Sequence, residues 1–251
     1  MRRNLHYLNS LIVPLMAYAG VALGGLWPLL PWVITFGVVA LLELFLPEHT
    51  DNRYDEDETL PAGILVLHWV AHVGLLSIWA WKFWQGSYTP TEALLSALAV
   101  GFSAGASGIV IAHEMLHRKG RLWQLGAKTL LASTGNVYFY VTHVRMHHRY
   151  VGTELDYSSA RKGESLYAFL RRTVPGQLRW AWQAEKKRLS QQGLPPFHPS
   201  NYMIQQALLW ILLAATFGWI GGLWGLAAFV LQGIVANFLL EYVNYIEHYG
   251  F

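Results

Sequence analysis

Two groups of histidines are the residues in this sequence that could most readily do chemistry. The first lies in HEMLH, where His113 and His117 are four residues apart. On a helix both side chains would lie on one side and could bind the same metal ion. This spacing alone is compatible with interfacial histidines at a helix end, with a zinc protease that uses Glu114 as general base, and with a two-metal site.

The second group, HVRMHH, favours one of these interpretations. It contains His143, His147 and His148, which repeats the four-residue spacing and adds a neighbour. A zinc protease needs about three protein ligands and leaves one position open. Five imidazoles gathered at one face would also repel each other if they were protonated, whereas a bound metal keeps them neutral. The two groups together predict a metal site rich in histidine; the alternative is chance clustering.

A third polar group lies near the end of the sequence, on an apolar helix. Asn237, Glu241, Asn244 and His248 follow one another at intervals of four, three and four residues, which places them on one stripe. A helix from Gly221 to His248 would be roughly 42 Å long. The hydrocarbon core of a membrane is about 30 Å thick. We therefore expect this helix to carry His248 beyond the membrane to the other histidines. For Asn237 the alternative is a hydrogen bond between helices.

Composition places these histidines in a membrane protein. Hydrophobic residues make up 54% of the 251 residues and charged residues only 13%, with a mean hydropathy of +0.28. The absence of cysteine excludes disulfides, iron–sulfur clusters and thiolate zinc sites. Imidazole ligands without thiolate suit iron, zinc, copper or nickel. Many such ligands in an apolar setting favour oxygen chemistry on a lipid-soluble substrate, without choosing between hydroxylation and desaturation.

Apolar segments of about 20 residues predict an all-α integral membrane protein with six spans. A cytoplasmic insert, residues 113–202, separates the fourth span from the fifth, and residues 1–251 form one domain. Within this insert, we expect the interrupted apolar segment from Leu122 to Val144 to be a helix at the membrane interface. The six predicted spans are approximately residues 8–26, 28–46, 62–84, 92–112, 203–220 and 221–246.

The distribution of basic residues predicts the orientation. Fourteen of the eighteen Lys and Arg residues lie between Arg118 and Arg188, and Arg2, Arg3 and Arg53 fall on the same side of a six-span arrangement. The positive-inside rule then places this region and both termini in the cytoplasm, at the inner membrane. Such a basic face could steer an acidic electron carrier or hold anionic lipid head groups.

Three stretches, HEMLHR, HVRMHHRYVGTELDYSSARKGES and NYIEHYG, resemble the membrane alkane monooxygenase family, one of the histidine-rich di-iron membrane hydroxylases and desaturases. The resemblance implies a non-haem centre of two iron ions that uses dioxygen to hydroxylate the terminal carbon of an alkane or similar alkyl chain. It also implies electrons from a rubredoxin-type carrier and its reductase.

The resemblance also implies roles for individual residues. Asp156 would orient a ligand through the other ring nitrogen of a histidine, and Asn244, Glu247 and Glu241 are candidates for similar hydrogen bonds. Glu114 would not be a base, and no catalytic residue is expected beyond the metal centre. The implied iron ligands are His113, His117, His143, His147, His148 and His248.

The sequence departs from the family pattern in three places. Met146 stands where the family usually has Gly, and Tyr157 follows Asp156 where Pro is usual. The family's further histidine box, beyond NYIEHYG, is missing, which predicts a chain truncated at its C-terminus. Such a truncated chain could be inactive. Alternatives to an alkane hydroxylase are a fatty-acyl desaturase, an aromatic methyl hydroxylase, a zinc intramembrane protease and a non-catalytic metal-binding membrane protein.

Two further features have simpler explanations. His68 and His72 are four residues apart within the third span but match no ligand box, so we expect them to form hydrogen bonds between helices. The small residues from Gly101 to Gly108 predict close helix packing. They could also leave room for a linear alkyl chain beneath the metal site.

Overall fold

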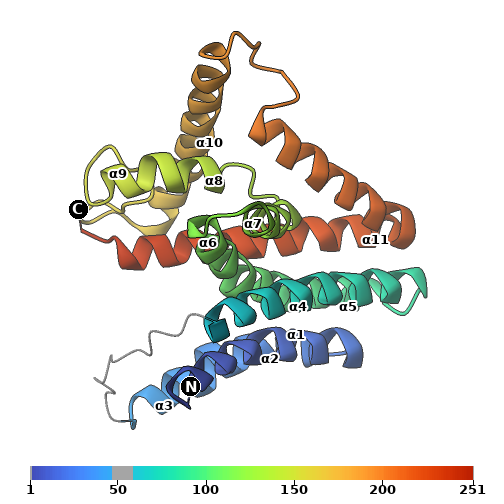
Figure 1. The fold of residues 1–251 in the computed structure, drawn as a ribbon. Coiled ribbons are helices and arrows are strands. Elements are labelled where there is room, and N and C mark those ends of the chain that lie inside the picture. Colours follow the sequence, from blue (N-terminus) through green and yellow to red (C-terminus); the bar gives the residue numbers. More distant parts are fainter. Residues whose placement is uncertain (1, 47–58, 251) are drawn as a thin grey trace.

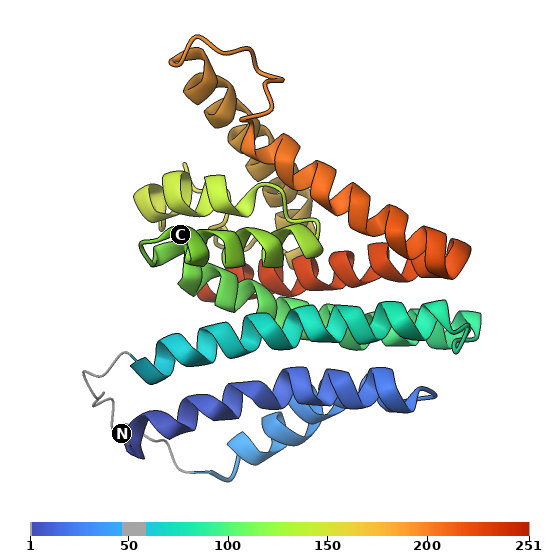
Figure 2. The ribbon, with the colours of Figure 1, turned by 45° about the vertical axis from the view of Figure 1, so that its right-hand side comes forward.

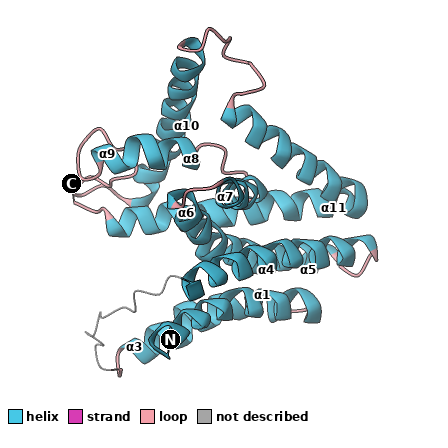
Figure 3. Ribbon diagram, in the orientation of Figure 1, coloured by secondary structure: helices cyan, strands magenta, loops and turns pink. Residues whose placement is uncertain are grey.

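Helices form the regular secondary structure of the part of the chain that the structure describes, residues 2–46 and 59–250. The structure is a computed structural model, and within these residues it describes side chains from Tyr7 onward. Figure 3 shows helices connected by loops. A single isolated bridge joins Ala160 to Tyr249. The predicted all-helical class is confirmed for these residues.

The N-terminal segment is a helical hairpin, coloured blue in Figures 1 and 2. The chain turns at Gly24 and Gly25, whose φ angles of 68° and 54° favour glycine. The two sides of the hairpin touch, since a Cβ on Gly20 would lie 2.9 Å from the Cα atom of Pro28. Its elements are η1 (Arg2–Leu11), α1 (Ile12–Leu23), η2 (Trp27–Leu29), α2 (Leu30–Trp32), the π-helical η3 (Val33–Val39) and α3 (Ala40–Glu43).

Two long helical runs follow and lie next to the hairpin (Figure 2). The first is α4 (Thr59–Trp84). A capping box starts the second run, because the Thr89 hydroxyl accepts from the Glu92 backbone N–H while the Glu92 carboxylate accepts from that of Thr89. This run continues without a break until His117, and therefore delivers the first histidine group. It consists of α5 (Pro90–Ser103), the π-helical η4 (Ala104–Ile109) and α6 (Val110–His117).

The insert contains several shorter helices and one long one. The expected helix from Leu122 to Val144 is wrong in its second half, because α7 stops at Ser133 and the chain turns through Gly135 at a φ of 73°. The long α10 projects away from the other helices in Figures 1 and 2. The elements are α7 (Arg121–Ser133), α8 (Phe139–Thr142), the π-helical η5 (His143–His147), α9 (His148–Tyr150) and α10 (Leu166–Ser190).

The last helix, α11 (Tyr202–Glu247), consists of two arms. Gly222 interrupts the helical backbone with a φ of 59° and a ψ of −149°. The break falls within the predicted boundary between the fifth and sixth spans. Figure 1 shows the second arm running back toward the histidine-bearing end of the molecule. The turn at this glycine therefore brings the C-terminal histidine to the insert.

Three helical stretches of the described chain are long and apolar enough to cross a membrane. They are residues 59–84, 90–117 and 202–247, and the last of these is the two-armed helix. Two shorter apolar stretches, Tyr7–Leu23 and Trp27–Glu43, precede them. These stretches coincide with the predicted apolar segments and indicate a membrane protein.

Small residues allow α5 and η4 to approach the second arm of α11 closely. A Cβ on Gly101 would lie 2.7 Å from both the carbonyl oxygen of Gln232 and the Cβ of Val235. One on Gly105 would lie 3.0 Å from the Cα of Ala236. The close packing predicted for this small-residue run is confirmed, and it fixes α6 relative to the end of α11.

Candidate metal centre

Helix α6 positions the first histidine pair. His113 and His117 lie one turn apart, and their Nε2 atoms are 3.0 Å from each other. The predicted sharing of one helix face is therefore confirmed. Gln124 of α7 holds the end of this helix, because its side-chain amide donates to the carbonyl oxygens of Leu116 and Arg118.

The second histidine group lies on a π-helical turn rather than on a regular α-helix. In the π-helical turn η5 the residues five positions apart come together. His143 accordingly pairs with His148, with 2.8 Å between their Nε2 atoms. The four-residue spacing of His143 and His147 also brings their rings together, with 5.4 Å between the ring centroids. The Nε2 atom of His143 is therefore paired with His148, whereas Nδ1 of His147 is hydrogen-bonded to Asp156.

The pair from α6 and the pair of His143 and His148 lie next to each other. One ligand nitrogen from each of the four side chains can be chosen so that all lie within 4.8 Å of one another. Two histidine nitrogens that each lie 2.0–2.1 Å from one metal ion, with an angle of 90° between the two bonds, are about 3 Å from each other. The two paired distances of 2.8 and 3.0 Å are compatible with that spacing. The donor set is His113, His117, His143 and His148.

The electrostatics of this cluster favour neutral imidazoles. Burial, followed by the neighbouring histidines, lowers the pKa of His143 to about 2. The pKa of His148 is also lowered, first by burial and then by His117 and His147. A neutral imidazole keeps a lone pair available for a metal. The residues present therefore fit a metal that prefers nitrogen ligands.

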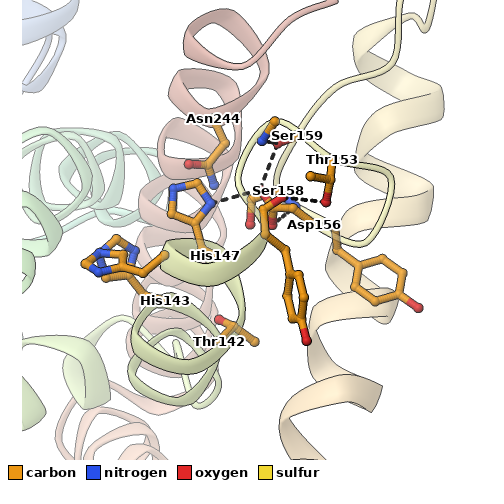
Figure 4. A network of polar contacts seen from close by, with 12 residues as sticks. Thr142, His143, His147, Thr153, Asp156, Ser158, Ser159 and Asn244 are labelled. Atoms are coloured by element: carbon orange, nitrogen blue, oxygen red, sulfur yellow. Dashed lines mark hydrogen bonds and ion pairs between the residues drawn. The ribbon is translucent and has the colours of Figure 1, made fainter. Parts of the chain in front are cut away.

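His147 forms a hydrogen bond with Asp156, as Figure 4 shows. The distance from His147 Nδ1 to Asp156 Oδ2 is 2.9 Å. Asp156 is buried; although burial opposes its ionisation, hydrogen bonds from His147, Ser159 and Ser158 lower the pKa of its carboxyl group. A carboxylate that accepts from Nδ1 leaves the Nε2 lone pair of His147 directed elsewhere.

His248 lies beside His147, with 4.9 Å between the ring centroids. The loop after Asp156 holds it there: the backbone N–H of Ala160 donates to the carbonyl oxygen of His248, and that of Gly250 donates to Ala160. The six predicted ligands therefore form a cluster of four and an adjacent pair. The sequence placed His248 near the insert, but it gave no sign of this backbone pairing.

The polar residues of α11 lie around this pair. Asn244 is drawn next to His147 in Figure 4, and its amide donates to Glu241. Buried Glu241 also accepts hydrogen bonds from Tyr138, at the start of α8, and from Gln177 of α10. Its role is therefore to connect these two helices to α11. Glu247 is exposed and lines the edge of the site. Tyr138 and Gln177 were missed by sequence reasoning, because nothing in their local pattern distinguishes them.

A cavity of about 620 Å³ opens next to the histidines. Five of the six predicted ligands line one part of it: His113, His143, His147, His148 and His248. Much of the remaining wall is apolar and comes from η3, α5, η4 and α11, including Phe36, Phe102, Ile109, Leu239 and Val243. The site therefore combines metal-binding side chains with a space suited to an apolar molecule.

Comparison with known proteins places this arrangement in a family. The family model for fatty acid desaturases matches residues 89–251, which include every predicted histidine ligand. The chain belongs to the fatty acid desaturase family. Within it, the chain resembles proteins that oxidise hydrocarbons, and it spans about three fifths of the length of the first curated relatives it matches.

Three relatives illustrate the resemblance. Alkane 1-monooxygenase 1 of Pseudomonas aeruginosa is 37% identical over 87% of this chain and 59% of its own length. Alkane 1-monooxygenase 2 of Alcanivorax borkumensis is 30% identical over 95% of this chain and 65% of its own length. The xylene/toluene monooxygenase hydroxylase component XylM of Pseudomonas putida is 26% identical over 98% of this chain and 67% of its own length.

Two further histidines of this desaturase-family chain serve its helix packing. His68 on α4 bonds to Ser10 and Ser107 through its two ring nitrogens, and His72 bonds to Ser133. Both rings are buried. The predicted role in hydrogen bonds between helices is therefore confirmed, and these histidines are not part of the four-histidine cluster.

Proposed function

We propose that this protein hydroxylates an alkyl chain with dioxygen at an iron centre. The observation that carries the proposal is the four-histidine cluster next to a mainly apolar cavity of about 620 Å³. Membership of the desaturase family and similarity to alkane 1-monooxygenases support it. Terminal alkane carbons are the proposed site of reaction, by analogy with those relatives.

Two iron ions are the proposed metals, and the six histidines named above are their proposed ligands from this chain. Bound there, iron would supply dioxygen activation. The overall reaction converts a C–H bond, dioxygen, two electrons and two protons into an alcohol and water. Electrons are proposed to come from a rubredoxin-type carrier and its reductase, for which the basic residues of the insert form a suitable docking surface.

The protein's own residues would hold the metal ligands and the hydrocarbon in position. Asp156 holds His147 in one ring orientation through its bond to Nδ1. Glu241 and Gln177 hold the neighbouring polar wall, because Glu241 accepts from both Gln177 and Asn244. The apolar wall, including Phe102 and Leu239, would bind a hydrocarbon by excluding water from it. Asn244 and Glu247 are proposed to support this arrangement as polar neighbours of the ligands.

The proposed setting is the cytoplasmic membrane, with six spans and the histidines on the cytoplasmic side. The two arms of α11 and the two halves of the N-terminal hairpin would account for four spans, and α4 and the α5–α6 run for two. Arg53 lies outside the described residues, as do the side chains of Arg2 and Arg3. The proposed orientation therefore rests on the basic insert and on the positive-inside rule.

A turnover experiment tests the proposed function. The purified chain would receive ferrous iron, a rubredoxin-type carrier, its reductase and NADH, with octane as substrate. We expect 1-octanol and matching oxygen consumption. If an iron-loaded sample consumed no oxygen and formed no product, hydroxylation would be contradicted.

The similarity to XylM over nearly the whole chain makes an aromatic methyl hydroxylase the second candidate function. The same assay with xylene distinguishes it, since methylbenzyl alcohol would then exceed 1-octanol. An acyl substrate provides a third comparison, in which a new double bond would indicate a desaturase.

A further inference from the structure

A second apolar groove lies along α4, on residues that do not line the histidine cavity. It consists of two hollows, of about 310 and 320 Å³, on either side of Trp69, whose indole N–H donates to the Thr129 hydroxyl of α7. The first lies between α4, α6 and α7, and the second lies between α4, α7 and the first arm of α11, so an acyl chain that occupied both would pass over the Trp69 ring.

The length of the groove suits a lipid chain. Val66, Trp69, Val73, Leu76 and Ala80 line it at intervals of three or four residues, and therefore follow one face of α4. Fourteen helical residues span roughly 21 Å. This exceeds one leaflet of a hydrocarbon core that is about 30 Å thick. An acyl chain can therefore lie along the groove from one surface of the membrane.

Basic residues lie at the end of this groove that is close to the N-terminus of α7. The Arg118 guanidinium lies 5.2 Å from the ring centre of Trp123, a residue that lines the first hollow. Lys119, on the short connection, and Arg121, the first residue of α7, are exposed close to the lining residue Leu122. Glu114 is the one acidic residue in the sequence between Glu92 and Glu154. The mouth of the groove is therefore complementary to an anionic head group.

We propose that this groove binds one anionic phospholipid. Its acyl chain lies along α4, and its phosphate rests on the connection from Arg118 to Arg121. A hydrocarbon substrate would use the apolar walls but would leave this charge unused. The proposal goes beyond the proposed hydroxylation and does not depend on it.

A lipid at this position would support the end of α6 that carries His117. Gln124 of α7 donates to the carbonyl oxygen of Leu116, and Met115 of α6 packs against Gly126 of α7. Groove-lining residues therefore belong to both helices. Binding would hold α6 and α7 together without contacting the histidine cluster.

Native mass spectrometry of the metal-free chain tests the proposal. The protein would be released from vesicles containing equal amounts of phosphatidylglycerol and phosphatidylcholine. We expect one phosphatidylglycerol to be retained per chain. A K119Q/R121Q variant should retain at least about tenfold less, since each basic residue near a membrane surface adds to the attraction.

Two further variants make the outcome specific. K186Q/K187Q removes the same charge from α10 and should retain phosphatidylglycerol as the unmodified chain does. V73W should fill the groove and reduce retention of either lipid. Equal retention of the two lipids by the unmodified chain would overturn the proposal, as would equal losses in the two charge variants or full retention by V73W. Circular dichroism of each variant confirms that it is folded.

Discussion

At the scale of single residues, Asp156 determines how His147 is presented. Its carboxylate is buried and accepts three hydrogen bonds, one of them from Nδ1 of that histidine. Replacing it by Asn removes the negative charge but keeps the size of the side chain. Because such outer hydrogen bonds raise ligand basicity, we expect Asp156→Asn to weaken metal binding by about 10–100-fold.

Titration of the metal-free variant with Co²⁺ against a competing chelator measures this change. Glu154→Gln is the matched control, since Glu154 is exposed in the same loop and should leave the affinity unaltered. Equal affinities of the unmodified chain and Asp156→Asn would contradict the assigned role.

His113 and Glu114 are neighbours with different predicted roles. His113 contributes a nitrogen to the four-histidine cluster, whereas the Glu114 side chain is 57% exposed. His113→Ala should lower bound iron by at least about tenfold, because it removes a direct ligand, and Glu114→Gln should leave bound iron and alkane oxidation unchanged. Elemental analysis and product assays check both. Loss of activity in Glu114→Gln with iron retained would instead favour a general base at that position.

The sequence was sufficient to identify the histidine groups, because polar residues at regular spacing are conspicuous in an apolar chain. The family resemblance added Asp156 as the partner of a histidine, without saying which one. The sequence was insufficient to predict which histidines pair. A π-turn changes the register by one residue, and the resulting contact between His143 and His148 depends on packing against α6. Tyr138 and Gln177 carry no spacing signal, so only the folded chain reveals their contacts with Glu241.

At the scale of elements, close packing of α5 on α11 determines where the two histidine-bearing ends meet. Gly101→Ala should lower stability by about 1–3 kcal/mol, because the added methyl group meets backbone and a β-branched side chain at 2.7 Å. Gly63→Ala on α4 is the control: its Cβ would meet nothing within 4 Å, and alanine favours a helix.

Thermal unfolding in detergent, monitored by circular dichroism, compares these two variants. We expect Gly101→Ala to have a lower melting temperature than the unmodified chain, and Gly63→Ala to show no decrease. An unchanged melting temperature in Gly101→Ala would show that the two helices can separate without cost.

Element boundaries could be predicted where local signals are strong. The turn near Gly222 was placed within a residue or so, since glycines interrupt an otherwise apolar run. The end of α7 was not, because the interruption at Thr134, Gly135 and Asn136 was interpreted as part of one interfacial helix, whereas the chain turns at Gly135. The spacing of apolar residues alone could not distinguish the turn at Gly222 from the end of α7.

At the scale of the whole molecule, the proposed orientation makes a prediction that is easy to test because the sequence contains no cysteine. Ser87→Cys lies in the connection between α4 and α5, and Lys162→Cys lies in the basic insert. With six spans and cytoplasmic termini, a membrane-impermeant maleimide should label Cys at 87 from outside intact spheroplasts. Position 162 should be labelled only after lysis. The reverse pattern would contradict the orientation.

The central claim is that the histidine clusters bind iron for oxygen chemistry. The most direct measurement is elemental analysis of iron and zinc in the chain purified without added metal. The account predicts iron close to two ions per polypeptide and little zinc. About one zinc per polypeptide with no iron would contradict it.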